Sequence, residues 1–313
     1  MPNIRDIANK TGYSVATVSR VLSNHPYVSD EKRKHILAVV EELNYIPNQT
    51  ARALSLGKTQ NIGVVIPFTN HTYYDRLISG IINEAFKHDY RVTLLPTNYS
   101  KEKEKQYMDE FAAKTFDGII LTTTANASAF YKSYLQHGPV IFCEKMNEPE
   151  YTCVFEDLEG AIISTFSVLS SKDVQSIGLT LGRSKHISNY SKMIINLTET
   201  FFPNFSRKNI FWECYSAHDA HEAAQFFSTL PLDAILTNGD DVAATIIQNF
   251  PSNQTLPLII GREHLLISEI LNFSTIETQL ELCGKEAFKL FLSGDNVKKK
   301  IPYNFIARHH KTP

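Results

Sequence analysis

The stretch Ser14-Val15-Ala16-Thr17-Val18-Ser19-Arg20-Val21-Leu22 predicts a short helix with two different faces. A helix advances 100° per residue, so side chains three and four positions apart lie on the same side. The apolar side holds Val18, Val21 and Leu22. The opposite side holds Ala16, Ser19 and Arg20, with Val15 at its margin. We therefore expect one face to be buried and the other, which is small and flat with a single long cation, to stay exposed.

A second amphipathic segment precedes this helix. Ile4, Ile7 and Ala8 form an apolar stripe at helical spacing. Gly12 favours a tight turn, and Ser14 is a good N-cap for the helix that follows. Helix, glycine-containing turn and helix is the arrangement in which the second helix presents its first residues to base edges in the major groove of DNA.

A third helix is expected next, capped by Ser29. Asp30 and Glu31 lie in its first turn, where the helix dipole favours negative charge. Its apolar stripe is expected to bury Ile36, Leu37, Val40 and Leu43. The basic run Lys32-Arg33-Lys34 is interpreted either as a solvated face or as a source of phosphate contacts.

Three segments carry a specific combination of residues: Ile4-Arg5-Asp6-Ile7-Ala8, Gly12-Tyr13 followed by the stretch from Ser14 to Leu22, and Glu42-Leu43-Asn44-Tyr45-Ile46-Pro47-Asn48. Together they closely resemble the DNA-binding head of the LacI/GalR family of bacterial transcriptional regulators. The resemblance is dense over residues 3–67 and continues as spaced motifs to Arg308. It implies an all-α helix-turn-helix DNA-binding domain over residues 1–46. The residues implied to contact operator DNA are Ser14, Val15, Ala16, Thr17, Ser19 and Arg20.

Residues 47–60 are predicted to form a hinge helix and linker. Pro47 starts a helix well, and the helical pattern runs from Asn48 until Gly57 ends it. A helix this short is marginal in water, so it should order only when something holds it. The resemblance implies that two such helices of a dimer pair in the minor groove, with Asn48 at the DNA and Leu54 as a wedge between bases. The alternative is that Leu54 packs on the body of the protein.

Composition and charge set broader bounds. A chain of 313 residues with 43% hydrophobic composition can bury more than one core, so we expect two or three domains. Residues 1–60 contain eight Lys or Arg and five Asp or Glu, whereas the remaining residues contain 23 and 28. A modestly basic head on an acidic body suits a protein that presents one end to a polyanion.

The cysteines and the apolar runs indicate the compartment. The four cysteines of the chain are Cys143, Cys153, Cys214 and Cys283. No two of them have Cys-x-x-Cys spacing, which favours buried reduced thiols over a zinc site. The N-terminus has no apolar run of signal-peptide length, and no segment reaches about 18 consecutive apolar residues. We expect a cytoplasmic protein that has no metal site and no cofactor.

From residue 61 onward, short apolar runs alternate with helical patterns. The predicted strands are 62–66, 92–95, 118–121, 140–143, 177–181, 210–212, 234–236 and 258–260. The predicted helices are 75–88, 101–114, 158–171, 218–230 and 240–250. This alternation predicts parallel sheets covered by helices, but periodicity alone does not distinguish one large sheet or a barrel from two smaller sheets.

The resemblance implies two α/β lobes of the periplasmic-binding-protein type with a ligand cleft between them. On this basis residues 61–313 form an effector-binding and dimerisation core. Lobe 1 is expected at about 61–157 and 280–300, and lobe 2 at about 158–279 and 301–313. Residues 284–292 should return to lobe 1, and 303–307 to lobe 2.

The family's effector positions can be placed on this sequence, with uneven support. Tyr73 and Tyr74 follow the first strand, and Lys192 stands where the family has an arginine, with His186 and Ser188 upstream. Asn238 and Asp240 follow a strand at its carboxyl end, where open α/β sheets bind ligands. The expected effector-binding residues are Tyr73, Tyr74, His186, Ser188, Lys192, Tyr215, Asn238, Asp240, Arg262 and Glu263. The alternative is structural, because paired tyrosines are common in cores and Asn-Gly-Asp is a good turn.

Arg262-Glu263 is a departure from the family's Gly-Tyr-Asp motif. An arginine presents a fork suited to a carboxylate or phosphate, which suggests an anionic effector such as a sugar phosphate. The same residues also fit a salt bridge between Arg262 and Glu263, or a degenerate site, and these two interpretations together are favoured over an anionic effector.

The predicted function is therefore a sequence-specific transcriptional regulator, a repressor of carbohydrate-utilisation genes. It is expected to bind a palindromic operator as a homodimer and to respond to a sugar or sugar-phosphate effector. The alternatives are a solute-binding protein, which would begin with a signal peptide and lack the head, and a regulator whose ligand cleft is degenerate. An enzyme is disfavoured, because the chain has no dinucleotide fingerprint, P-loop or nucleophile elbow.

Overall fold

The protein is described by a computed structural model that places residues 2–46, 57–69, 71–182, 184 and 187–308. It divides into two units, residues 1–61 and 62–313, which are described separately. The predicted hinge helix, with Asn48 and Leu54, lies outside the described residues, and so does His186.

The described part of the first unit has three helices around one small core. They are α1 (Ile4–Thr11), α2 (Val15–Leu22) and α3 (Asp30–Glu42). Gly12 ends α1 in the left-handed conformation (φ 72°), which a glycine adopts without strain, and Ser14 caps α2 by accepting a hydrogen bond from the Thr17 amide. The buried core consists of Ile7, Ala8, Val18, Val21, Ile36 and Val39. The helix-turn-helix predicted from the sequence is thus present.

One prediction about α3 was wrong. Leu37 was expected in the buried stripe, but 46% of it is exposed, and Val39 is buried instead. Val39 lies three residues after Ile36 and therefore shares its side of the helix, whereas Leu37 lies 100° away. Ser29 is the N-cap residue of α3, as predicted, although its side chain makes no capping hydrogen bond.

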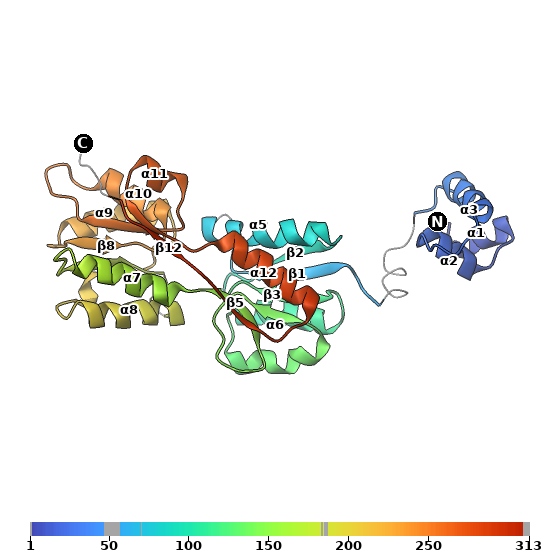
Figure 1. The fold of residues 1–313 in the computed structure, drawn as a ribbon, viewed down its shortest axis with the longest axis horizontal. Helices are drawn as coiled ribbons and strands as arrows, with labels where there is room; N and C mark the ends of the chain where they lie inside the picture. Colours follow the sequence, from blue (N-terminus) through green and yellow to red (C-terminus); the bar gives the residue numbers. More distant parts are fainter. Residues whose placement is uncertain (1, 47–56, 70, 183, 185–186, 309–313) are drawn as a thin grey trace. The chain divides into compact units, whose positions relative to one another are not determined.

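The second unit contains two six-stranded sheets, each forming one lobe (Figure 1). In spatial order, the sheet of lobe 1 consists of β11 (Lys298–Ile301), β5 (Thr152–Glu156), β4 (Val140–Phe142), β3 (Gly118–Leu121), β1 (Asn61–Ile66) and β2 (Arg91–Pro96). The helices of lobe 1 are α5 (Thr72–Lys87), α6 (Lys101–Ala112), η1 (Ser128–His137) and α12 (Leu280–Ser293). Helices α5 and α12 share one buried core with the sheet, while α6 and η1 share the core on its other face.

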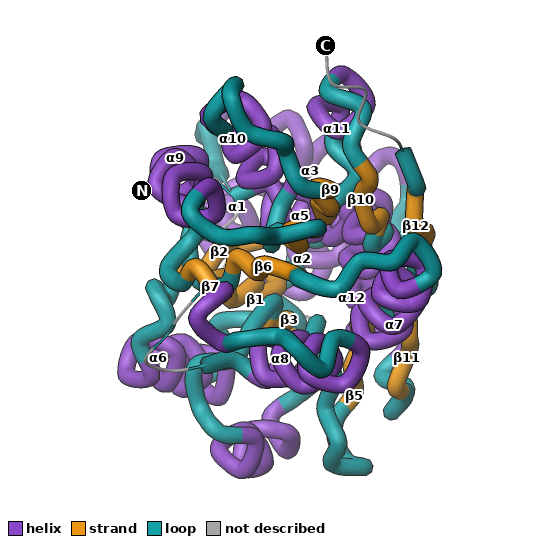
Figure 2. Tube along the Cα trace, turned by 90° about the vertical axis from the view of Figure 1, so that its left-hand side faces the viewer, coloured by secondary structure: helices purple, strands orange, loops and turns teal. Residues whose placement is uncertain are grey.

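Lobe 2 repeats this plan. In spatial order, its sheet consists of β12 (Asn304–Ile306), β10 (Ser274–Glu277), β9 (Leu258–Arg262), β8 (Ala234–Leu236), β6 (Ile177–Thr180) and β7 (Ile210–Phe211). Its helices are α7 (Leu158–Ser170), α8 (Asn189–Phe201), η2 (Arg207–Asn209), α9 (Ala217–Ser228), α10 (Asp240–Asn249) and α11 (Leu266–Ile270). Helices α7 and α8 pack against one side of this sheet, and α9 and α10 against the other (Figure 2).

The chain passes between the two sheets after β5, after β10 and after β11. All eight strands expected from periodicity are present, with ends that agree within two residues. Periodicity missed the remaining elements of this unit, which are β5, β10, β11, β12, α8, α11, α12, η1 and η2. Strand β11 contains Lys298, Lys299 and Lys300. Lysines suit an exposed sheet edge, but this run lacks the apolar alternation by which a strand is predicted from sequence.

Helices α5 and α12 pack with unusually close backbones. A Cβ atom added at Gly80 would lie 2.1 Å from the Glu281 carbonyl oxygen, and one added at Gly284 would lie 2.0 Å from that of Leu77. Only glycine fits at these two positions. Among the described helices, none is both long and apolar enough to cross a lipid bilayer.

Candidate nucleic-acid interface and interlobe site

The outward face of α2 presents side chains that the head itself does not use. Val15 is 42% exposed, and Ala16 and Arg20 are exposed as well. Within the described residues, the Arg20 side chain makes no hydrogen bond or ion pair. The Ser14 and Thr17 hydroxyls, in contrast, lie 2.9 Å apart and are engaged at the helix start. Arg20 is therefore free to reach a partner, whereas Ser14 and Thr17 first stabilise the helix.

The three side chains of the basic run in α3 differ in their contacts. Arg33 donates from Nη1 to the Asn24 side-chain oxygen at 2.8 Å and from Nη2 to the His25 carbonyl at 2.6 Å. It therefore stabilises the loop that follows α2. Lys32 lies over the ring of Tyr13, with Nζ 5.8 Å from the ring centroid, and Lys34 is exposed.

The two lobes of the second unit meet through segments that follow their strands. The Thr72 hydroxyl, in α5 of lobe 1, donates to Asp241 Oδ2, in α10 of lobe 2, at 3.1 Å. Arg76 of α5 donates from Nη1 to the carbonyl of Glu263, directly after β9, at 2.8 Å. Open α/β sheets bind ligands where such segments converge.

Arg262 lies at this junction. Its Cζ atom is 5.5 Å from the ring centroid of Tyr73 in lobe 1 and 5.0 Å from that of Tyr190 in lobe 2. Both distances fall within the range of cation–π attraction. The Tyr73 hydroxyl also donates to Glu156 Oε2, at the end of β5, at 2.9 Å. A cation from lobe 2 is thus enclosed by groups from both lobes.

The charges at the junction perturb one another. Burial raises the pKa of Glu263 to about 8 and also raises that of Glu156, while the charge of Arg262 opposes both shifts. Burial alone would lower the pKa of Arg262, but Tyr190, Glu263 and Glu156 hold it above its ordinary value, so the guanidinium stays charged. Burial, with the charge of Arg262, lowers the pKa of His71.

Several polar atoms at the junction lack a hydrogen-bond partner. Within the described residues, the buried side-chain atoms without one are Glu156 Oε1, Arg262 Nε, Glu263 Oε1 and Thr278 Oγ1. Glu263 also has a φ of 106°, which is strained for a residue with a Cβ. Buried polar atoms are normally paired, and strained residues cluster at functional sites. Both observations therefore single out this junction.

Lys192 was expected to contact the effector from the loop after the fifth strand; it lies instead in α8, and it is exposed. The residue of that helix that faces Arg262 is Tyr190, which was not among the predicted site residues. The available signal was its position two residues after Ser188, the N-cap of α8, which places Tyr190 in the first turn. Ser188 itself accepts the Ser191 amide at 3.0 Å and so acts as a cap.

Other predicted effector residues are engaged within their own lobe. Asp240 is fully buried and accepts hydrogen bonds from the Thr275 hydroxyl and the Leu265 amide, both at 2.7 Å, so its carboxylate is not open to a ligand. Asn238 accepts from the Thr180 hydroxyl at 2.8 Å and donates to the Cys214 carbonyl at 2.6 Å.

The remaining predicted tyrosines are paired with polar groups near them. The Tyr74 and Tyr99 hydroxyls lie 3.4 Å apart, and the Tyr74 ring contacts those of Phe68 and Tyr73. Tyr215 donates to Glu213 Oε2 at 2.8 Å. Of the predicted set, the structure brings Tyr73, Arg262 and Glu263 together at the junction.

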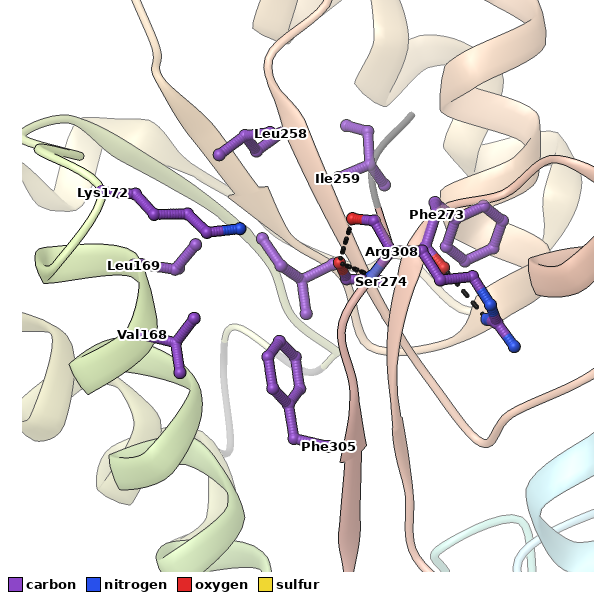
Figure 3. Close-up of a pocket in the computed structure, with 10 residues that line it drawn as sticks. Val168, Leu169, Lys172, Leu258, Ile259, Phe273, Ser274, Phe305 and Arg308 are labelled. Atoms are coloured by element: carbon purple, nitrogen blue, oxygen red, sulfur yellow. Dashed lines mark hydrogen bonds between the residues drawn. The ribbon is translucent and has the colours of Figure 1, made fainter. Parts of the chain in front are cut away.

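Two hollows lie near these elements. A groove of about 360 Å³ runs beside the second crossing between the lobes, lined by Arg76, Glu263 and residues 277–282. A cavity of about 20 Å³ lies inside lobe 2, where Arg308 donates to the Phe273 carbonyl and pairs with Ser274 (Figure 3). The second is large enough for about one water molecule, so it is a packing gap and not a ligand site.

Comparison with protein families agrees with this geometry. The protein-family model described as "Bacterial regulatory proteins, lacI family" matches residues 3–48. The model described as "Periplasmic binding proteins and sugar binding domain of LacI family" matches residues 59–256. The chain belongs to the LacI family of bacterial regulatory proteins.

Individual LacI-family proteins match along almost the whole chain. Catabolite control protein B of Bacillus subtilis (strain 168) is 36% identical over 307 residues, which cover 97% of this chain and 99% of that protein. The Ribose operon repressor of the same organism is 28% identical over 319 residues, covering 96% and 93%. The structure of the Lac repressor dimer bound to operator and the anti-inducer ONPF has a TM-score of 0.82 at 19% identity, covering 99% and 98%.

These findings confirm the family resemblance and the predicted fold class, a helix-turn-helix head followed by two α/β lobes. The relatives are transcriptional regulators and not enzymes, which agrees with the regulatory function predicted from the head.

Proposed function

We propose that this LacI-family protein is a sequence-specific DNA-binding repressor of carbohydrate-utilisation genes that binds an inverted-repeat operator as a homodimer. The observation that carries the proposal is the exposed face of α2, where Arg20 has no partner among the described residues and Val15 and Ala16 are exposed. Arginine suits a guanine edge, and small apolar side chains suit thymine methyl groups. That the Ribose operon repressor is a relative supports a carbohydrate operon as target.

Exposed apolar side chains on the second unit support the homodimer. Ile82 and Phe86 of α5 are 43% and 82% exposed, and Leu266 and Ile270 of α11 are 68% and 66% exposed. Each pair is four residues apart and so shares one side of its helix. Figure 1 shows both helices along the upper side of the two lobes. Apolar patches of this kind mark protein interfaces, and a second copy of the chain is the partner that a palindromic operator requires.

The proposed effector is a small polar molecule, a sugar or sugar phosphate, that binds between the lobes. Tyr73 would supply an aromatic platform and Glu263 a hydrogen-bonding carboxyl group. The carboxyl groups of Glu156 and Glu263 beside Arg262 favour a neutral sugar over a sugar phosphate. A ligand that favours one lobe arrangement would change the spacing of the segments over residues 47–60 of the two copies. Typical couplings of about 1 to 3 kcal/mol change affinity roughly 5- to 150-fold.

The test is selection of binding sites from a random DNA library, followed by titration of the variant Arg20→Ala. We expect an inverted repeat of about 14 to 18 base pairs with an easily deformed centre. The variant should lose about 1 to 3 kcal/mol and relax its preference at one position per half-site. Arg207→Ala, an exposed arginine of lobe 2, is the matched control and should bind like the wild type. A library that yields no palindrome, or a variant of unchanged specificity, would contradict the proposal.

A second candidate function is a LacI-family regulator that needs no effector. The observation that favours it is the position of Arg262, which already fills the space between Tyr73 and Tyr190. A solute-binding protein is not favoured, because the chain carries the lacI head.

A further inference from the structure

The junction between the lobes contains a cation that belongs to the protein itself. Arg262 ends β9 of lobe 2 and is only 9% exposed. One ring that flanks its guanidinium, Tyr73, comes from α5 of lobe 1, and the other, Tyr190, from α8 of lobe 2. A ligand bound between the lobes would make the same kind of two-sided contact. Arg262 therefore stands where a flat cationic ligand would stand.

The surroundings of Arg262 are already matched to its charge. Glu156 of lobe 1 and Glu263 of lobe 2 both act electrostatically on it, and Tyr73 is held in place by its hydrogen bond to Glu156. The hydrogen bonds from Thr72 to Asp241 and from Arg76 to the Glu263 carbonyl join the same two lobes. These groups thus stabilise the arrangement of the two lobes in the structure, which we call closed.

The same groups are sealed from solvent. Glu156 Oε1, Arg262 Nε and Glu263 Oε1 are each buried without a hydrogen-bond partner among the described residues. A buried polar atom left unpaired costs free energy, so the closed arrangement must be stabilised enough elsewhere to offset several of them. A ligand could satisfy these atoms only after the lobes separate and Arg262 moves.

We infer that Arg262 is a built-in latch: its guanidinium, held between Tyr73 and Tyr190, keeps the two lobes together without an effector, and an effector binds by displacing it. The latch itself concerns only the second unit. Its influence on DNA rests on the proposed function, in which the lobe arrangement sets operator affinity.

The inference has a chemical consequence that can be measured. Arg262→Ala removes the guanidinium but leaves the two rings and the carboxyl groups of Glu156 and Glu263. The vacated space should then accept a small planar cation from solution, because aromatic faces attract guanidinium groups and a bound cation, like Arg262, would favour the ionised forms of the two carboxyl groups. Methylguanidinium is the smallest probe that reproduces the lost group.

The experiment compares the full-length wild type with Arg262→Ala by calorimetric titration with methylguanidinium chloride and by small-angle X-ray scattering. We expect saturable binding to the variant and none to the wild type. We also expect a larger radius of gyration for the variant that returns toward the wild-type value when the probe is bound. Tetramethylammonium chloride, a cation without the planar fork, is the control ligand, and Arg207→Ala is the control protein.

Four results would overturn the latch. They are no saturable binding to Arg262→Ala, equal binding to the wild type, equal binding of tetramethylammonium, and an unchanged radius of gyration in Arg262→Ala. If that variant fails to fold, Arg262→Met keeps the bulk of the side chain, and Tyr190→Leu removes one of the two rings. Both should enlarge the radius of gyration, and wild-type values in both would contradict the inference.

Operator titrations of the same samples separate the latch from the proposed function. If methylguanidinium changes the radius of gyration of Arg262→Ala and also its operator affinity, both are supported. If the radius responds while operator affinity does not, the latch stands and the proposed coupling to DNA fails. If operator binding is intact but the radius never responds, the latch fails and the DNA-binding function stands.

Discussion

The exposed face of α2 and the interlobe junction use similar side chains in opposite ways. On α2, Arg20 is exposed, and its side chain makes no hydrogen bond or ion pair with the described residues. At the junction, Arg262 is buried between Tyr73 and Tyr190 beside two carboxyl groups. One arginine is available to a partner, and the other is already occupied by the protein itself.

The two regions should therefore respond differently to a substitution. The head needs only a small core to present α2, so its surface can read a rigid partner without rearranging. The junction is assembled from segments of both lobes, so any change there alters how the lobes are held.

The largest effect is expected from the core of the head. Ile36 is fully buried in a six-residue core, so Ile36→Ala should cost about 2 to 5 kcal/mol, enough to unfold so small a unit. We expect DNA binding to disappear while the second unit melts at an unchanged temperature, measured by differential scanning calorimetry. Leu37→Ala is the matched control, since this neighbour is 46% exposed and should change stability little. A shift in the melting of the second unit would show that the two units do not unfold independently.

The next effect concerns the pairing of two copies. Phe86→Glu places a charge on the exposed apolar side of α5 and should weaken the proposed homodimer. Because pairing raises the effective concentration of the second head, operator affinity should fall roughly 100-fold. Analytical ultracentrifugation and DNA titration measure the two changes. Ile163→Glu, an exposed apolar residue of α7, is the control. Dimerisation that survives Phe86→Glu would place the interface elsewhere.

The smallest effect concerns the junction and pH. Burial raises the pKa of Glu263 to about 8, so the folded protein binds this proton more tightly than the unfolded chain does. Stability should therefore fall as pH rises from the ordinary glutamate pKa toward 8, by at most about 2 kcal/mol between pH 6 and 8. Glu263→Gln should flatten that decline in thermal melts, whereas Glu281→Gln, an exposed glutamate at the nearby groove, should not. A slope that persists in Glu263→Gln would assign the titration to another group.

Local patterns in the sequence were enough for the head. Gly12, Ser14 and the stripe of Val18 and Val21 act within one or two helical turns, and the structure has the turn, the cap and the buried face that they predict. The choice between Leu37 and Val39 was wrong because it depends on which side of α3 meets the other two helices. That choice is made by packing and not by the helix itself.

The strands of the second unit were also predictable, because buried strands are short apolar runs between turns. Their division into two sheets was not, since periodicity does not encode which strands pair. It came from the family resemblance and is confirmed by the topology. The edge strand β11 escaped detection because its lysines lack the apolar pattern.

The helix-turn-helix and the alternation of strands and helices follow from the sequence alone, and the family resemblance supplied the candidates Tyr73, Arg262 and Glu263. Tertiary contacts determine that Tyr190 and not Lys192 faces Arg262, and that Asp240 is sealed inside lobe 2. The physical reason is distance along the chain. A helix cap or stripe is fixed by neighbours a few residues away, whereas the junction joins α5, β5, α8 and β9, and its contacts exist only after two separately folded sheets have met.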